Sequence, residues 1–176
     1  MTTSSLAETI QKTIAFVQNN PSSAMATYRA EVRWDHGTQC SGFVRKFEPL
    51  VIDEPPSLGG NDAGMNPVEL LLVSLGACQE IAYSLFASVM GIQIDAVQVK
   101  VKGQLDVRGI FGDDKSIPPG YQGVTFETKI DSPADADTIK ALVEAVESGC
   151  PTLDTFRRPV PVTGEVFLNG TPVTSV

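Results

Sequence analysis

The chain has 176 residues, of which 42% are hydrophobic and 19% are charged, a composition typical of one globular domain rather than of a disordered chain. Its formal net charge of −8 argues against nucleic acid and anionic membrane surfaces as partners, because both attract basic proteins. Three cysteines and one histidine, without a C-x-x-C pair, exclude the usual structural zinc sites.

The N-terminal residues contain no basic segment followed by an apolar one, so we expect no signal peptide. The longest apolar stretch, Leu70–Cys78, is too short and too polar to span a bilayer. Both features predict a cytoplasmic protein, and in that reducing compartment structural disulfides are rare.

The first third of the chain is predicted to contain a helix and a β-hairpin. Apolar residues at helical spacing predict a helix over residues 4–19, which we assign to an N-terminal extension (1–24) of the main domain (25–176). Alternating residues predict a strand over 26–34, and a turn joins it to a second strand over 38–47.

A loop rich in proline and glycine, residues 53–67, leads into a long predicted helix. Such a loop can carry function or can be a plain connector, and both interpretations stay open. Asn66 is suited to cap the helix, Pro67 to be its first residue and Gly91 to end it after Met90. Because this helix is apolar nearly all round, we expect it to be the buried central helix.

The second half of the chain alternates between predicted strands and helices, which indicates an α+β domain. The predicted segments are strands over 94–109 and 121–130, a helix from 131–133 to Gly149, a short helix over 152–156 and a last strand over 160–168.

Two of the three cysteines are candidates for chemistry. Cys78 lies in the middle of the central helix, where a cysteine more often packs as a small hydrophobic residue. Cys150 lies between Gly149 and Pro151, at a predicted helix N-cap where a thiolate would be favoured, although a cysteine that merely fits the junction is equally consistent. Cys40, in a strand, is interpreted as structural.

Several motifs together resemble the OsmC/Ohr family of thiol peroxidases. Leu58–Cys78 resembles the family's glycine loop, its Asn-Pro-x-Glu-Leu segment and its small-residue helix ending in Ala-Cys. Gly149–Pro151 matches the second motif, Gly-Cys-Pro, and Leu105–Gly109 followed by Gly120–Tyr121 resembles one branch of the family. The similarity runs from about Tyr28 to Leu168.

This resemblance implies a fold in which antiparallel β-sheets wrap around the buried central helix, in an intertwined homodimer with two sites at the subunit interface. It also implies that Cys78 is the peroxidatic thiol that attacks an organic hydroperoxide, that Cys150 is the resolving thiol, and that an external dithiol restores the enzyme. The resulting disulfide would protect against over-oxidation, and no metal or organic cofactor is required.

One position departs from the family pattern. The best-known members have a glutamate ten residues before the reactive cysteine, where it orients an arginine over the thiolate, and this chain has Val68 there. Arg45 and Arg108 are the candidate arginines, with Arg157 and Arg158 as a third choice, and each could equally be a solvated surface charge.

Two functions are therefore compared. The first is a cysteine-based peroxidase acting on organic hydroperoxides, which the pair of cysteines favours. The second is a non-catalytic protein that binds a small hydrophobic molecule beside Cys78, which the missing glutamate favours. A purely structural dimer would explain neither the cysteine motifs nor the glycine loop.

Overall fold

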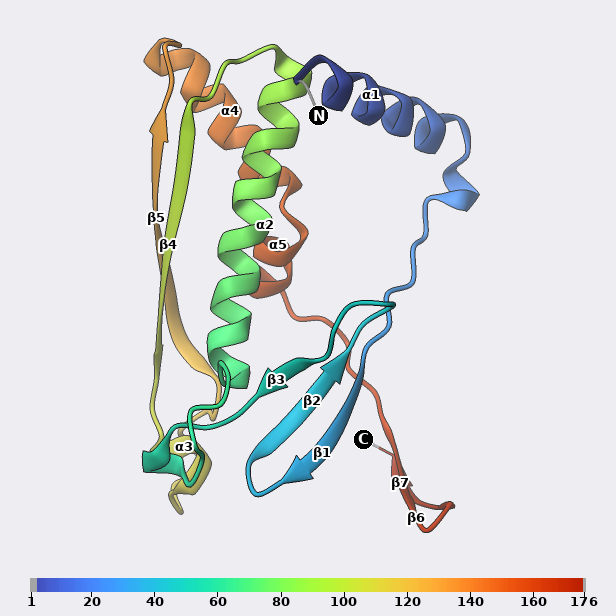
Figure 1. Cartoon of the computed structure of the whole chain (residues 1–176), viewed down its shortest axis with the longest axis vertical. Coiled ribbons are helices and arrows are strands. Elements are labelled where there is room, and N and C mark those ends of the chain that lie inside the picture. Colours follow the sequence, from blue (N-terminus) through green and yellow to red (C-terminus); the bar gives the residue numbers. More distant parts are fainter. Residues whose placement is uncertain (1–2, 176) are drawn as a thin grey trace.

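The computed structural model describes residues 3–175, and one long helix, α2, has some of the elements packed around it while the N-terminal strands and the C-terminal hairpin extend away (Figure 1). The elements are α1 (Thr3–Asn19), β1 (Glu31–His36), β2 (Gln39–Phe43), β3 (Leu50–Ile52), α2 (Pro67–Met90), β4 (Ala96–Leu105), α3 (Arg108–Phe111), β5 (Tyr121–Asp131), α4 (Ala136–Gly149), α5 (Pro151–Arg157), β6 (Glu165–Leu168) and β7 (Thr171–Ser175). Short 3-10 helices cover Pro21–Ser23 and Pro56–Leu58. The fold class is α+β, as predicted, with antiparallel sheets.

Local signals determine both ends of α2. The Asn66 side chain accepts a hydrogen bond from the Glu69 backbone N–H, and the Glu69 carboxylate accepts one from the Asn66 N–H, which together form a capping box. Pro67 is the first helical residue, and Gly91 ends the helix in the left-handed conformation with φ of 69°. The predicted boundaries of this helix are therefore confirmed.

Within the single chain, α2 is buried on one face. Its buried residues pack against the β4–β5 hairpin and against α4 and α5 (Figure 1). Elsewhere around the helix, Leu71, Val73 and Ile81 are 49%, 51% and 59% exposed. The sequence predicts that a partner chain supplies the remaining cover.

By length and composition alone, α2 is apolar enough to cross a membrane. The expectation that this segment is too short applies only to the run 70–78, because the helix continues to Met90. The same composition suits the core helix of a soluble protein, and α2 packs here against α1, β4, α4 and α5.

The β4–β5 hairpin confirms the two strands predicted in the second half, but the first of them ends at Leu105 rather than at residue 109, because Arg108 begins the short helix α3. The hairpin's antiparallel register runs from Ala96 opposite Asp131 to Leu105 opposite Tyr121. The following helix begins later than predicted, at Ala136, because the chain is still in β5 at Asp131 and the Asp135 side chain caps the helix by accepting hydrogen bonds from two backbone N–H groups.

The N-terminal hairpin forms as predicted, but its first strand begins at Glu31 rather than at residue 26. Glu31 lies opposite Phe43, the last residue of β2, and Arg45 then adopts a positive φ of 51° that turns the chain away. Residues before Glu31 therefore have no strand to pair with, and Tyr28 is 92% exposed.

The C-terminal segment was predicted to end in one strand, and this was wrong. Only Glu165–Leu168 of the predicted range is β6, and the chain then turns back into β7. Asn169 and Gly170 both have positive φ, which is the geometry of a tight hairpin turn, and the Asn-Gly pair in the sequence is its usual signal.

Candidate active site

The sulfur atoms of Cys78 and Cys150 lie 3.3 Å apart, although the two residues are 72 positions apart in the chain. Cys78 projects from the middle of α2, and Cys150 is the single residue between α4 and α5. Both are free thiols, and the Cys150 S–H donates a hydrogen bond to the Cys78 sulfur. The structure thus brings together the two cysteines that the sequence singled out.

The Gly-Cys-Pro segment positions Cys150 at this contact. Gly149 ends α4 against the Phe86 ring of α2, where an added Cβ would lie 2.4 Å from the nearest ring atom. Cys150 leaves the helical conformation with φ of −85° and ψ of 107°, and Pro151 starts α5 as its first residue. The close approach of α4 to α2 therefore requires a residue without a side chain immediately before the cysteine.

The two thiols differ in burial. Cys150 is 1% exposed and forms a buried cluster with Leu75 and Leu153, whereas Cys78 is half-buried and packs at the edge of that cluster. Val101, Val124, Phe126 and Phe156 complete the surroundings. An incoming molecule would meet Cys78 first.

The pKa of Cys78 is below the ordinary value of a thiol. Burial raises this pKa, but hydrogen bonds from the Thr152 hydroxyl, the Thr152 backbone N–H and the Cys150 thiol lower it by more. Sequence analysis did not select Thr152. Its position two residues after Cys150, in the first turn of a predicted helix, is the signal that could have identified it.

The pKa of Cys150 is raised, contrary to the expectation that the helix N-cap would favour a thiolate there. Burial is the largest cause, and the neighbouring Cys78 adds to it, while the backbone N–H groups of Leu153 and Thr152 only partly offset the rise. Cys78 is therefore the more acidic of the two thiols.

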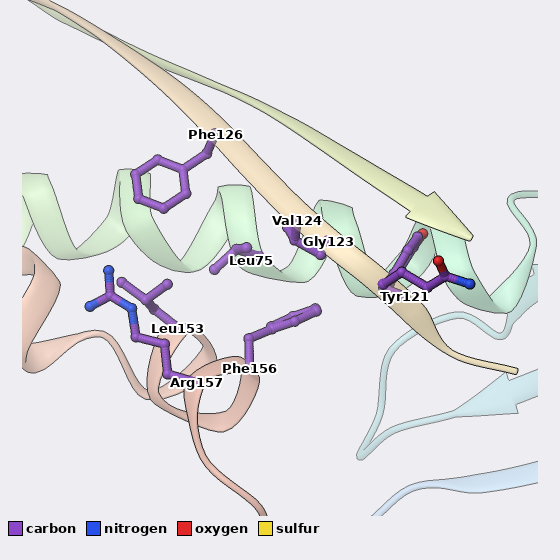
Figure 2. A pocket seen from close by; sticks show the side chains of 9 residues that line it. Leu75, Tyr121, Gly123, Val124, Phe126, Leu153, Phe156 and Arg157 are labelled. Atoms are coloured by element: carbon purple, nitrogen blue, oxygen red, sulfur yellow. The ribbon is translucent and has the colours of Figure 1, made fainter. Parts of the chain in front are cut away.

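A cavity of about 330 Å³ borders the same cluster, between α2, β5 and α5 (Figure 2). Leu75, Val124, Phe126, Leu153 and Phe156 belong to both the cavity wall and the surroundings of the thiols. Tyr121, Gln122, Gly123 and Arg157 complete the lining. Neither cysteine lines the cavity, which is joined to the thiols through the shared apolar residues and can hold a small molecule with both apolar and polar parts.

The predicted arginines have other partners within the chain. Arg108 forms an ion pair with Asp106 that also lowers the pKa of Asp106 to about 2, and Arg45 lies over the Phe47 ring. Arg157 pairs with Glu147, and Arg158 pairs with Asp154. Among the described residues, none of these arginines is a group that shifts the pKa of Cys78.

Val68, at the position where the resemblance implies a glutamate, lies in the first turn of α2, where its backbone carbonyl accepts a hydrogen bond from the Tyr121 hydroxyl at 2.8 Å. Tyr121 lines the cavity, and its ring lies so close to Gly103 that an added Cβ there would be 2.3 Å away. At this end of the cavity, β5 and α2 are therefore joined by a hydrogen bond between two uncharged groups.

The loop before α2 closes on Asp53, a buried carboxylate that sequence analysis did not select. Hydrogen bonds from the Thr38 hydroxyl and from the backbone N–H groups of Asn61, Ala63 and Glu54 lower its pKa to about 2. Close backbone approaches explain two of the loop glycines. A Cβ on Gly60 would meet the Glu54 carbonyl at 1.7 Å, and a Cβ on Gly64 would meet the Val51 carbonyl at 2.1 Å. The loop supports the start of α2.

Within the described residues, no group of three or more His, Cys, Asp or Glu side chains is arranged to hold a metal ion. Cys40 lies in β2 opposite Trp34 and Ile52, apart from the thiol pair. The site therefore offers the chemistry of two adjacent thiols near a cavity with a mixed apolar and polar lining.

Comparison with known proteins matches residues 59–165 to the family model described as OsmC-like protein. An OsmC-like protein from Mycoplasma pneumoniae is similar in structure, with a TM-score of 0.64 and 20% identity over 75% of this chain and 88% of that one. An organic hydroperoxide resistance protein from Legionella pneumophila has a TM-score of 0.58 and 22% identity over 76% and 91%. One from Elizabethkingia anophelis has a TM-score of 0.56 and 21% identity over 77% and 91%. A search of curated proteins gave no match.

Proposed function

Because the chain belongs to the OsmC-like protein family, we propose that it is a cysteine-based peroxidase that reduces organic hydroperoxides, with Cys78 as the peroxidatic and Cys150 as the resolving thiol. The names of the similar proteins from Legionella and Elizabethkingia support a role connected with organic hydroperoxides. Their low sequence identity means that the residues of this chain must carry the argument.

The observation that carries the proposal is the 3.3 Å contact between the two sulfur atoms, with the lowered pKa on the more exposed one. The thiolate is the nucleophile in peroxide reduction, so the acidic thiol has to be the one that a substrate can reach. A disulfide bond is about 2.05 Å long, and the small movement needed to form it favours resolution within one chain.

The first step is attack of the Cys78 thiolate on the terminal oxygen of the hydroperoxide. A sulfur–oxygen bond forms, the oxygen–oxygen bond breaks, and the departing alkoxide takes a proton to become the alcohol. Cys78 is then a sulfenic acid. Because the peroxide has been reduced by two electrons, the sulfur has been oxidised by two.

The second step is attack of Cys150 on the Cys78 sulfenic sulfur. The disulfide forms and the hydroxyl group, with the proton of Cys150, leaves as water. An external dithiol then reduces the disulfide by thiol–disulfide exchange. We place this cycle in the cytoplasm, where such dithiols are maintained.

The proposal also includes a homodimer of two copies of this chain. The half-exposed Leu71, Val73 and Ile81 on α2 suit cover by a second copy, and we expect an interface of more than about 2,000 Å². In such a dimer Arg45 and Arg108 are the candidates to approach Cys78 of the partner subunit. Sedimentation of a stable monomer at micromolar concentration would contradict this assembly.

The direct experiment is consumption of cumene hydroperoxide in the presence of dithiothreitol. The wild type should consume it faster than it consumes hydrogen peroxide, because the cavity beside the thiols is lined largely by apolar side chains. Cys78→Ser should reduce consumption to the rate of dithiothreitol alone, and Cys40→Ser should leave it unchanged. Equal rates for wild type and Cys78→Ser would remove the peroxidase proposal.

The cavity also supports the second candidate function, binding of a small hydrophobic molecule without chemistry. Its volume of about 330 Å³ is within the range of small-molecule sites. In that case Cys78→Ser should retain full affinity for the bound molecule, and the wild type should show no turnover of hydroperoxide. The experiment above therefore separates the two candidates.

A further inference from the structure

We infer that the ring of Tyr121 is the end wall of the cavity beside the thiols, and that it limits how long the apolar body of a substrate can be. The inference rests on the proposed function, because it takes the space between α2, β5 and α5 as the place where a substrate of Cys78 lies. The substrates that fit are hydroperoxides whose apolar body ends at or before this ring.

The cavity extends along α2 from the region of Cys78 toward the start of the helix. Leu75 lines the cavity three residues before Cys78, and residues at this spacing are neighbours on a helix surface. Tyr121 lies at one end of the lining residues in Figure 2 and Phe126 at the other, and the Tyr121 hydroxyl meets Val68 there. At about 1.5 Å per residue, Val68 is about 15 Å along α2 from Cys78. A molecule whose reacting end lies at Cys78 therefore extends toward Tyr121.

A β-bulge turns Tyr121 into the cavity. Strict alternation along β5 would place Tyr121 on the face opposite Val124 and Phe126. The pairing with β4 skips Gln122, which is the additional residue of the bulge, and such a residue changes the direction of the side chains next to it. Tyr121 therefore shares a face with Val124 and Phe126, and all three line the cavity.

Two contacts hold the ring in this position. The Tyr121 hydroxyl donates its hydrogen bond to the Val68 carbonyl of α2 at 2.8 Å. On β4, Gly103 leaves the space that the ring occupies, since an added Cβ would lie 2.3 Å from the nearest ring atom. Because the ring is held by α2 on one side and fits against the backbone of β4 on the other, it acts as a fixed wall.

A fixed wall has a specific consequence for binding. Each CH₂ group that a ligand buries fully in the cavity should raise its affinity about fourfold. This gain should stop at the chain length that reaches the ring, because further CH₂ groups find no apolar surface to cover. No bond forms or breaks at Tyr121, so this residue selects the substrate rather than assisting the chemical step.

The experiment uses straight-chain alcohols from butanol to dodecanol, which are the products expected from alkyl hydroperoxides. Each alcohol is tested for protection of Cys78 against iodoacetamide in reduced protein, by mass spectrometry of the Cys78 peptide. In the wild type, the half-protecting concentration should fall about fourfold per CH₂ and then stop falling at a break within the series. In Tyr121→Ala the break should move to longer alcohols.

Three further variants make the result specific. Tyr121→Leu keeps an apolar side chain for folding but is shorter than the ring, so its break should lie between those of the wild type and Tyr121→Ala. Tyr121→Phe keeps the ring over Gly103 and should keep the wild-type break. Tyr28→Ala removes a tyrosine that is 92% exposed and lies outside this cavity, and it should behave like the wild type. An unchanged break in Tyr121→Ala and Tyr121→Leu, or a break in Tyr121→Phe as long as that in Tyr121→Ala, would overturn the inference.

The readout also separates this inference from the proposed function, because protection requires no peroxide. A break that moves with residue 121, in a protein that consumes no hydroperoxide, would support Tyr121 as the end wall of a binding site and reject the peroxidase. Consumption of hydroperoxide without protection by any alcohol would support the peroxidase and overturn the role of Tyr121.

Discussion

Cys78 and Cys150 are in direct contact, yet their surroundings shift the pKa values of the two thiols in opposite directions. Cys150 occupies a helix N-cap, the position where free N–H groups would be expected to favour a thiolate, but it is 1% exposed and its pKa is raised. Cys78 lies in mid-helix, where its own helix offers no donors, and its pKa is lowered.

The difference shows that burial and nearby hydrogen-bond donors affect the pKa of a thiol more than its position within a helix does. Cys150 is covered by Leu75 and Leu153, and desolvation penalises its charged form. For Cys78, the hydroxyl and backbone N–H of Thr152 and the Cys150 thiol lower the pKa by more than burial raises it.

The largest effect on the reaction with hydroperoxide is expected when each of the two cysteines is replaced separately by serine. One equivalent of cumene hydroperoxide should leave Cys78→Ser unreacted, whereas Cys150→Ser should stop at the sulfenic acid of Cys78. Trapping with dimedone followed by mass spectrometry identifies that species. Cys40→Ser is the control and should form the Cys78–Cys150 disulfide. A dimedone adduct on Cys150 in Cys78→Ser would reverse the two roles.

The order of ionisation is the next test of the comparison. Because the pKa of Cys78 is lowered and that of Cys150 raised, the labelling rate of Cys78 should rise at lower pH than that of Cys150. Parallel iodoacetamide labelling of the reduced protein, followed by quantification of both peptides, measures this order. Simultaneous labelling would mean that the two sulfurs share one environment.

Removing a side chain from the buried cluster around Cys150 should reduce the difference in pKa between the two thiols. Leu153→Ala removes a buried side chain next to Cys150 and should lower the free energy of unfolding by roughly 2 to 4 kcal/mol. With water admitted, the pKa of Cys150 should fall and its labelling should accelerate. The matched control is Leu168→Ala in β6, where the side chain is 63% exposed and little stability should be lost. Urea unfolding and labelling together test both effects.

The smallest effect on the thiols is expected from Asp53, which lies in the loop before α2. Its pKa of about 2 is below the unfolded value of about 3.9, so the unfolded chain binds protons first as pH falls. This contribution to stability is present above about pH 4 and is lost toward pH 2. Asp53→Asn should weaken that pH dependence and leave the labelling order of the thiols unchanged, whereas Asp113→Asn, at an exposed residue, should change neither.

The sequence by itself determined the features that depend on neighbouring residues. Asn66, Pro67 and Gly91 act within one turn of the helix ends, so the bounds of α2 could be read directly. The Gly-Cys-Pro segment likewise specified the junction between α4 and α5, because glycine, cysteine and proline each act there through local backbone geometry. The resemblance to a family then identified which two cysteines to pair.

The tertiary structure decided what depends on distant partners. Strand β1 begins at Glu31 because β2 ends at Phe43, and no property of residues 26–30 reveals where a partner strand stops. The lowered pKa of Cys78 likewise depends on Cys150 and Thr152, which are distant in sequence and come close to α2 because α4 and α5 pack against it. Acidity is set by burial and by hydrogen-bond donors in space, and neither is encoded in the residues adjacent to a cysteine.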